Sequence, residues 1–202
     1  MSILESLRQV ESEMFDDLHP LAKEPLVMRE LYAIGYTMLA YVKGSPTELI
    51  KKQLKRQIIA LNLPSEFQQT ATNTALSAEA TIIYQILTNL ETAKHKYIFL
   101  LDLYQLASQD QNVTEAEREF LLLFERLLQL NIDEIHFIRG FRLAMLKKDV
   151  DLASKVVQEG IANDLPLPLQ ELSYFLKGFE FWKYEPSKGL METPIYRAKQ
   201  NM

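Results

Sequence analysis

The stretch KYIFLLDLYQLA, residues 96–107, decides the fold class of this 202-residue chain. Drawn as a helix it is apolar almost all round, and a second such stretch is FLLLFERLLQL, residues 120–130. A helix without a polar face is usually covered by other elements on several sides. We therefore predict that these two helices lie at the centre of an all-α, multi-helix bundle.

Helical periodicity extends outward over nearly the whole chain, and no segment shows sustained strand-like alternation. The pattern predicts helices at about 2–17, 24–42, 46–62, 65–74, 77–92, 95–109, 115–130, 133–147, 150–161 and 167–182. Ser45-Pro46-Thr47-Glu48 offers a capping hydroxyl, a proline at the first helical position and a carboxylate three residues after the cap. Thr114-Glu115-Ala116-Glu117 is a capping box without the proline.

A weak internal repeat divides the chain. Leu-Ala, Thr-Glu and Leu-Asn pairs in residues 39–63 recur in residues 106–132, at an offset of 67 that rises to 69 after a two-residue insertion. We interpret this as duplication of a helical unit, and chance similarity is the alternative. The predicted organisation is an N-terminal helix and connection at 1–25, a core at 26–148 with pseudo-repeated halves at about 26–75 and 94–148, a C-terminal helical extension at 149–182 and a tail at 183–202.

The composition excludes several classes of site. The chain has no cysteine, which excludes disulfide scaffolds, thiolate zinc sites, iron–sulfur clusters and cysteine nucleophiles. Its six glycines are too widely spaced for a phosphate-binding glycine loop. A net charge of −5 disfavours nucleic acid as the main partner. No apolar run approaches the ~20 residues that span a bilayer, so we expect a cytoplasmic protein without a transmembrane segment.

The sequence fits none of the common catalytic templates. The three histidines, His19, His95 and His136, lie far apart, and none belongs to a His-x-x-x-His pair. We expect each of them on the surface. No Gly-x-Ser-x-Gly nucleophile elbow occurs. These absences favour a protein that is not an enzyme and uses no cofactor. An enzyme that drew its acid–base pair from carboxylates would need a pocket around one of them with a raised pKa.

One acidic constellation stands out from the rest of the sequence. Asp102 interrupts the apolar stretch, and a carboxylate buried there needs a hydrogen-bond donor, a cation or a metal. Residues 110–114, DQNVT, place oxygen-bearing side chains at alternate positions, as cation-binding loops do, but they lack the EF-hand pattern. Two interpretations stay open. Either Thr114 and Glu117 cap the helix that follows, or the turn binds a divalent cation.

The same turn resembles the TerB-like family of tellurite-resistance and stress-response domains. The family signature is a helix ending in Ala-x-x-Asp-Gly, then a hydrophobic residue, Ser or Thr, and a Glu three residues later, with a Leu-Gly-Leu type turn after the next helix. The matching positions here are Ala107, Asp110, Val113, Thr114 and Glu117, with Leu130-Asn131-Ile132 at the closing turn. Gln111 replaces the signature glycine. The resemblance covers about residues 26–145.

The resemblance implies an all-helical bundle of two pseudo-symmetric halves and a bacterial stress-response module with membrane-associated partners. Some members bind divalent metal through their acidic turns, so Asp110 and Glu117 carry over as metal ligands, and Asp102 joins them by position. The corresponding residues of the first half are Gly35, Lys43 and Ile50, none of which is a ligand. Lys43 would place an ammonium where a metal site needs an anion.

Two further features point to partners. Lys51, Lys52, Lys55 and Arg56 form a basic stripe on one predicted helix. A solvated face is its ordinary interpretation, and an acidic partner or anionic lipid is the alternative. Trp182, the lone tryptophan, ends the last predicted helix. There it either seals the tail onto the core or anchors a partner.

The sequence therefore supports two functions of different classes. The leading hypothesis is a non-enzymatic helical module that acts by protein–protein contact in a bacterial stress-response system, in the cytoplasm or peripheral to the inner membrane. The alternative is a divalent-cation sensor that uses the acidic turn around Asp110 and Glu117. Neither hypothesis involves nucleic acid or a transmembrane segment.

Overall fold

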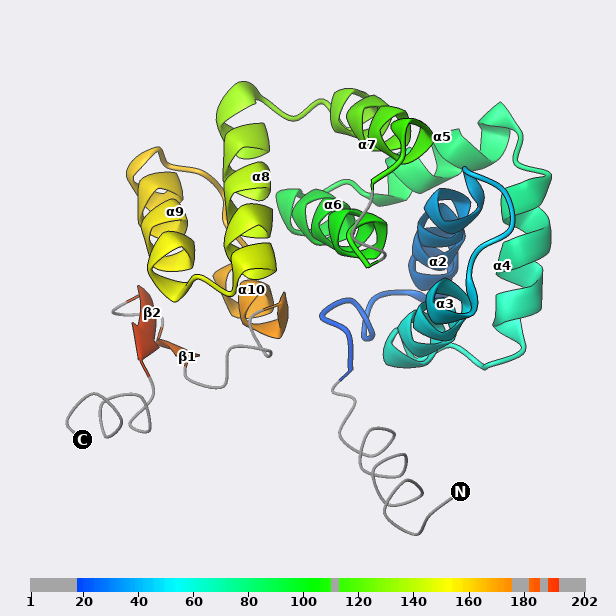
Figure 1. The fold of residues 1–202 in the computed structure, drawn as a ribbon, viewed down its shortest axis with the longest axis horizontal. Coiled ribbons are helices and arrows are strands. Elements are labelled where there is room, and N and C mark those ends of the chain that lie inside the picture. Colours follow the sequence, from blue (N-terminus) through cyan, green and yellow to red (C-terminus); the bar gives the residue numbers. More distant parts are fainter. Residues whose placement is uncertain (1–17, 110–112, 176–181, 186–188, 193–202) are drawn as a thin grey trace, which may run out of the picture.

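The computed structural model describes residues 18–109, 113–175, 182–185 and 189–192 (Figure 1). Within these ranges the chain is almost entirely helical, which confirms the predicted all-α class. The helices are α2 (Leu26–Tyr41), α3 (Glu48–Ala60), α4 (Phe67–Leu76), α5 (Ala80–Asn89), α6 (Ala93–Ala107), α7 (Glu115–Leu127), α8 (Ile132–Lys147), α9 (Val150–Ala162) and α10 (Leu169–Phe175), followed by two short strands, β1 (Trp182–Glu185) and β2 (Gly189–Glu192). The helix predicted at 2–17 lies outside the described residues.

Side-chain caps set where individual helices begin. α7 starts with the predicted capping box, in which Thr114 and Glu117 each bond to the other's backbone amide. α3 starts two residues later than predicted. Its cap is Thr47 rather than Ser45, because the Thr47 hydroxyl accepts a hydrogen bond from the amide of Ile50 at 3.4 Å.

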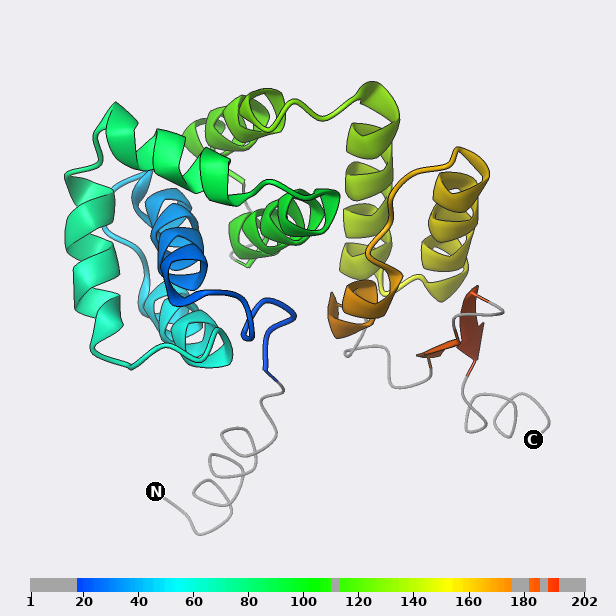
Figure 2. The same ribbon diagram turned by 180° about the vertical axis from the view of Figure 1, so that it is seen from behind.

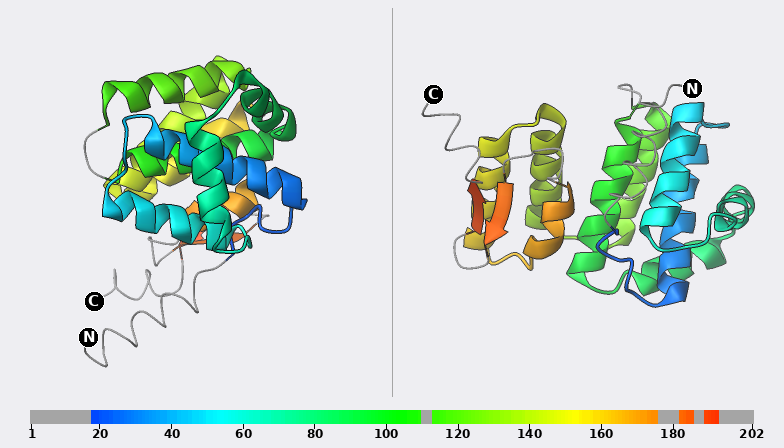
Figure 3. Two further views of the ribbon diagram at one scale, coloured as in Figure 1. Left: turned by 90° about the vertical axis from the view of Figure 1, so that its right-hand side faces the viewer. Right: turned by 90° about the horizontal axis from the view of Figure 1, so that it is seen from below.

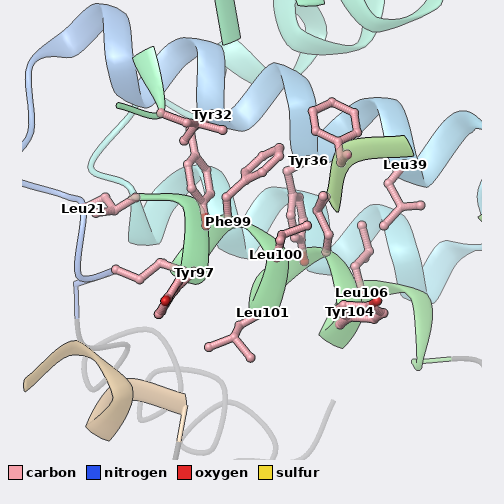
Figure 4. Close-up of a cluster of buried hydrophobic side chains, with 14 of the residues drawn as sticks. Leu21, Tyr32, Tyr36, Leu39, Tyr97, Phe99, Leu100, Leu101, Tyr104 and Leu106 are labelled. Carbon is pink, nitrogen blue, oxygen red and sulfur yellow. The ribbon is translucent and has the colours of Figure 1, made fainter. Parts of the chain in front are cut away.

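α6 is the centre of the fold. Figure 1 shows it between α2 and α8, and it packs against α2, α7 and α8. Its side chains from Tyr97 to Leu101 are completely buried, as the apolar stretch predicted (Figure 4). The predicted central position of the other apolar stretch was wrong. Because α7 packs mainly against α6, half of it faces outward, and Leu122, Leu123 and Leu127 are 41–46% exposed.

The close contact between α2 and α6 depends on a glycine. A Cβ atom at Gly35 of α2 would lie 2.8 Å from Cζ of Phe99 on α6, closer than two carbon atoms can approach. Phe99 is itself fully buried, and its ring packs edge-on against Tyr32 of α2. Because the ring is held in this way, only glycine at position 35 lets the two helices approach so closely.

Two groups of helices flank this centre. α3, α4 and α5 pack against α2, while α9 packs against α8 (Figures 1 and 2). α10 contacts β1, and α9 contacts β2. These C-terminal elements lie at one end of the molecule and α4 lies at the other (Figure 3). α6 therefore separates the two groups and contacts an element of each.

The turns that end α3 and α7 share a left-handed residue. Asn62 and Gln129 both have a φ of 55°, in the left-handed region, and they lie 67 residues apart. In both turns the amide of this residue bonds to the carbonyl oxygen three residues earlier. The two-residue insertion in the predicted repeat is therefore unnecessary. Residues 61–63 correspond in geometry to 128–130 and not to 130–132.

The predicted end of the C-terminal helix, at about 182, was wrong. The described part of α10 is Leu169–Phe175, and Trp182 begins β1, which pairs antiparallel with β2. The sequence WKYE, residues 182–185, does alternate aromatic and charged residues, but four residues are too few for the alternation to indicate a strand. β1 therefore begins at the last residue of the predicted extension, 149–182, and β2 lies within the predicted tail, 183–202.

Candidate functional site

Asp102, near the middle of α6, is the centre of a buried polar cluster. Its side chain is 3% exposed, and one oxygen, Oδ2, accepts three hydrogen bonds. The donors are Nε2 of His19 at 2.8 Å, the hydroxyl of Tyr32 at 2.6 Å and Nε2 of Gln57 at 2.6 Å. They come from the turn before α2, from α2 and from α3. The carboxylate therefore joins three segments to α6.

His19 takes part in this cluster as a neutral donor. Its other ring nitrogen, Nδ1, accepts the backbone amide of Leu21 at 3.1 Å. An acceptor at Nδ1 assigns the proton to Nε2, which donates it to Asp102. The ring also lies 5.3 Å from the rings of Tyr32 and Tyr174. The predicted surface position of His19 was wrong, because a histidine in a turn gives no sequence signal of burial.

Two buried tyrosines near Asp102 keep their protons. Burial, followed by the charge of Asp102, raises the pKa of the Tyr32 and Tyr36 hydroxyls well above the ordinary value, so both stay protonated. A His–Asp pair also occurs in hydrolase triads, where the second ring nitrogen takes a proton from the nucleophile. In this chain the second ring nitrogen of His19, Nδ1, accepts a hydrogen bond from the backbone amide of Leu21, so it is not available as a base.

Glu117, in the first turn of α7, is the second buried carboxylate. Its Oε2 accepts hydrogen bonds from the amide and the hydroxyl of Thr114, both at 2.8 Å. Its Oε1 lies 2.9 Å from Nζ of Lys43. Lys43 belongs to the turn between α2 and α3, so this ion pair joins the two predicted halves. Both oxygens of Glu117 therefore have protein partners.

The predicted metal ligands have separate partners as far as the structure describes them. Asp102 bonds to side chains around α2 and α3, Glu117 bonds to Thr114 and Lys43, and Asp110 lies outside the described residues. No group of three metal-ligating side chains occurs in the described part of the chain. The capping role of Thr114 and Glu117 is confirmed, and the cation site stays a hypothesis.

A third buried carboxylate, which the sequence analysis did not single out, joins α6, α7 and α8. Glu125 of α7 accepts the hydroxyl of Tyr104 on α6 at 2.5 Å, and the guanidinium of Arg139 on α8 donates to both Glu125 oxygens, at 2.5 and 3.0 Å. Burial, followed by the bond to Glu125, raises the pKa of Tyr104 to about 12. The sequence did carry a signal for Glu125, because it is a charged residue inside the apolar stretch 120–130, just as Asp102 is inside 96–107.

The basic stripe occupies the outer face of α3. Lys51, Lys52, Lys55 and Arg56 are all exposed, as both interpretations of the stripe require. Lys51 pairs with Glu48 at 2.7 Å. The other three cations have no ion pair within the residues that the structure describes. The stripe is therefore a locally positive surface on a chain of net charge −5.

A polar cavity of about 380 Å³ opens beside the stripe, between the end of α2 and helices α3 and α4. Its lining residues are Tyr41, Lys51, Ser65, Glu66, Gln68, Gln69 and Thr72. Small-molecule sites are normally lined mainly by apolar side chains with a few fixed polar groups. This cavity has the opposite character, so it offers little to hold a small ligand.

The remaining candidate residues lie apart from these clusters. His136 is exposed, as predicted. The side chain of His95 is only 13% exposed, with Nε2 3.4 Å from Glu24 and a buried Nδ1 that lacks a hydrogen-bond partner among the described residues. The surface prediction for His95 was therefore wrong. Trp182 stands opposite Glu192 in the register of β1 and β2.

Comparisons of this chain with family models, with curated proteins and with solved structures find no match. The resemblance to the TerB-like family therefore rests on the motif around Asp110 and Glu117 alone. No helix within the described ranges is long and apolar enough to cross a membrane.

Proposed function

We propose that this chain is a non-enzymatic helical interaction module, resembling the TerB-like bacterial stress-response domains, that binds an acidic protein partner through the basic stripe of α3. The observation that carries this proposal is the stripe itself. Lys52, Lys55 and Arg56 are exposed side by side and have no acidic partner among the described residues. On an acidic chain, such a surface selects partners of opposite charge.

The expected strength of this contact follows from its exposure. A solvent-exposed ion pair contributes roughly 0–1 kcal/mol, so several pairs must act together. Their attraction also weakens as salt shortens the screening length. The stripe therefore supports recognition that depends on ionic strength, with its main effect on association rate and partner choice.

The non-enzymatic part of the proposal is supported by the buried carboxylates. Asp102, Glu117 and Glu125 each have protein partners at hydrogen-bonding distance. The nearest histidine, His19, uses both ring nitrogens within the cluster. Such saturated groups stabilise a fold, whereas an acid–base pair needs one group free to exchange a proton with substrate.

The proposal includes the pseudo-repeat and the location. The caps Thr47 and Thr114 lie 67 residues apart, as do the left-handed residues Asn62 and Gln129. This shared geometry supports two related halves, at about 26–75 and 94–148. The proposed location is the cytoplasm, with a partner that holds the module at the inner membrane.

The test is affinity capture from the native cells with three versions of the full chain. The versions are the wild type, the stripe variant K52E/K55E/R56E and the control K147E/K148E/K155E. The control reverses three exposed lysines, at the end of α8, in the turn that follows it and on α9, and changes the net charge equally. We expect the wild type and the control to retain the same partner and the stripe variant to lose it. Capture that is equal in all three, or no reproducible partner, would contradict the proposal.

Anionic lipid is the competing explanation for a basic stripe. Sedimentation with vesicles that contain an acidic phospholipid distinguishes the two. Binding to these vesicles that the stripe variant loses, without any captured protein, would assign the stripe to a membrane surface instead of a protein partner.

The divalent-cation sensor is less well supported. Both oxygens of Glu117 are occupied, and Lys43 places a positive charge beside them. A metal ion would have to displace that ammonium. Calorimetry with calcium, magnesium, manganese and zinc tests this function. Binding that Asp110→Asn weakens would favour the sensor, and no binding heat with any of the four would exclude it.

A further inference from the structure

The acidity of this chain is concentrated in residues 1–17, which we call the acidic segment. The segment has five acidic side chains and one basic side chain, a net charge of −4, so residues 18–202 together carry only −1. The acidic residues are Glu5, Glu11, Glu13, Asp16 and Asp17, and the basic residue is Arg8. The segment itself lies outside the described residues.

The sequence of the acidic segment is also amphipathic. Ile3, Leu7, Val10 and Met14 are spaced four, three and four residues apart, so they fall on one face of the helix predicted at 2–17. At 100° per residue, Glu11 and Glu13 fall on the two sides of this apolar face. The surface that suits such a helix offers both apolar and basic side chains.

The outer face of α3 has this composition. Leu49, Lys52, Arg56 and Ile59 follow one another in steps of three, four and three residues, so they form one continuous line along the helix. The two cations are exposed, and the apolar residues at the ends of the line are 54% and 46% exposed. With Glu48 included, α3 has one acidic and four basic side chains, a net charge of +3. We call this surface the α3 face.

The acidic segment joins the fold beside the α3 face. The backbone amide of His19 donates a hydrogen bond to the carbonyl oxygen of Ala60, the last residue of α3, at 2.9 Å. The exposed Leu18 is therefore held next to the end of α3 (Figure 1). α3 is about 20 Å long, and a helix over 2–17 would be about 24 Å long. The segment can therefore extend along the whole α3 face.

We propose that the acidic segment binds the α3 face of its own chain. When the segment lies beside α3 with its end at Ala60, an equal rise per residue brings Glu11 and Glu13 level with the turn that holds Lys52 and Arg56. Opposite net charges attract the two surfaces. The covalent link also supplies an effective concentration of about 1 mM, so individually weak contacts are sufficient.

This contact would regulate partner binding, a consequence that rests on the proposed function of the basic stripe. An acidic partner must displace the acidic segment before it reaches Lys52, Lys55 and Arg56. Apparent affinity falls in proportion to the fraction of chains whose stripe is open, so a segment bound half of the time halves it. The segment is therefore a built-in competitor with the chemistry of the partner.

A spin label tests the contact directly in the full chain. Because the chain has no cysteine, Ser6→Cys gives one attachment point for a nitroxide. Position 6 comes level with the Leu49 end of α3, far from the junction at Ala60. We expect the nitroxide to broaden the NMR signals of amides 49–52, and K52E/K55E/R56E or high salt to remove the broadening. Unbroadened signals, or broadening that the stripe variant retains, would overturn the proposal.

A charge-matched pair of variants separates the acidic segment from general acidity. With the same label, E11Q/E13Q/D16N/D17N should lose the broadening. The control E79Q/E119Q/D151N/D164N neutralises four exposed acidic side chains elsewhere, raises the net charge equally and should keep it. An excess of unlabelled wild type should leave the broadening unchanged. Loss of broadening in that mixture would assign the segment to a second copy of the chain and overturn the proposal.

Competition is measured with a fluorescent poly-glutamate peptide as the acidic probe. Fluorescence anisotropy should show that E11Q/E13Q/D16N/D17N binds the peptide at least about twofold more tightly than the wild type or the charge-matched control does. Equal affinity would overturn the competition. Equal binding of the wild type and this variant to vesicles with an acidic phospholipid would do the same, because it would show a stripe that the segment leaves open.

The outcomes distinguish this inference from the proposed function. Broadening of amides 49–52 without any captured protein partner refutes the proposed function alone. A captured partner that the stripe variant loses, without any broadening, refutes the binding of the acidic segment alone.

Discussion

At the scale of single residues, buried carboxylates determine how distant segments meet. The donors to Asp102 lie 83, 70 and 45 positions away in the sequence, at His19, Tyr32 and Gln57. The sequence showed that a carboxylate inside an apolar stretch needs partners. It did not show which partners, because hydrogen bonds over such separations form only when α2, α3 and α6 pack together.

Asp102→Ala removes the shared acceptor and leaves three buried donors without a partner. Removing one partner of a buried charged network typically costs ~3–5 kcal/mol, so we expect the free energy of unfolding to fall by about 3 kcal/mol or more. Urea unfolding measures this free energy for each variant. Asp102→Asn keeps an acceptor oxygen and should lose less. Asp151→Ala, at an exposed position of α9, should change stability by less than about 1 kcal/mol, and an equal loss there would contradict this role.

Lys43→Met leaves the buried carboxylate of Glu117 without its ammonium. We expect a loss of about 1–3 kcal/mol in the free energy of unfolding, because a desolvated charge loses its counter-ion. Lys51→Met is the matched control, since Lys51 also pairs with a glutamate but at an exposed position. That change should cost less than about 1 kcal/mol. Thermal unfolding of both variants compares them, and losses of equal size would show that Glu117 does not need the pair.

At the scale of elements, the apolar stretches of α6 and α7 look alike and have different surroundings. α6 has neighbours on three sides, so its prediction as the central helix is confirmed. α7 packs mainly against one helix and leaves leucines exposed. Composition alone could not separate the two, because burial depends on how many neighbours the tertiary structure provides.

Gly35→Ala tests the close approach of α2 and α6. The added Cβ would lie 2.8 Å from Cζ of Phe99, and relief requires a shift in a well-packed core. We expect the free energy of unfolding to fall by about 1–3 kcal/mol. Phe99→Leu alone should also destabilise the protein. Combined with Gly35→Ala, it should cost less than the sum of the two single changes, because the smaller side chain removes the clash. If the losses of the two single changes simply add in the double variant, the cost of Gly35→Ala does not come from a clash with Phe99.

At the scale of the whole molecule, burial is distributed unevenly. α2 contains eleven buried residues and α6 contains ten, whereas α4 and α5 each contain one. Hydrogen exchange follows local opening, which is easiest where few apolar contacts must break. Among the described helices, we expect the amides of α2 and α6 to exchange slowest and those of α4 and α5 to exchange fastest. Mass spectrometry measures the exchange of each helix. Exchange in α4 and α5 that is as slow as in α6 would contradict the uneven burial.

The sequence by itself determined the helical class, most of the helix positions and the capping box at Thr114 and Glu117, because periodicity and caps depend on residues a few positions apart. It also determined that the α3 stripe is exposed. Only the tertiary structure decided that His19 is buried, that Lys43 pairs with Glu117 and that α7 lies outside. Each of these depends on contacts between distant segments, which local patterns do not encode.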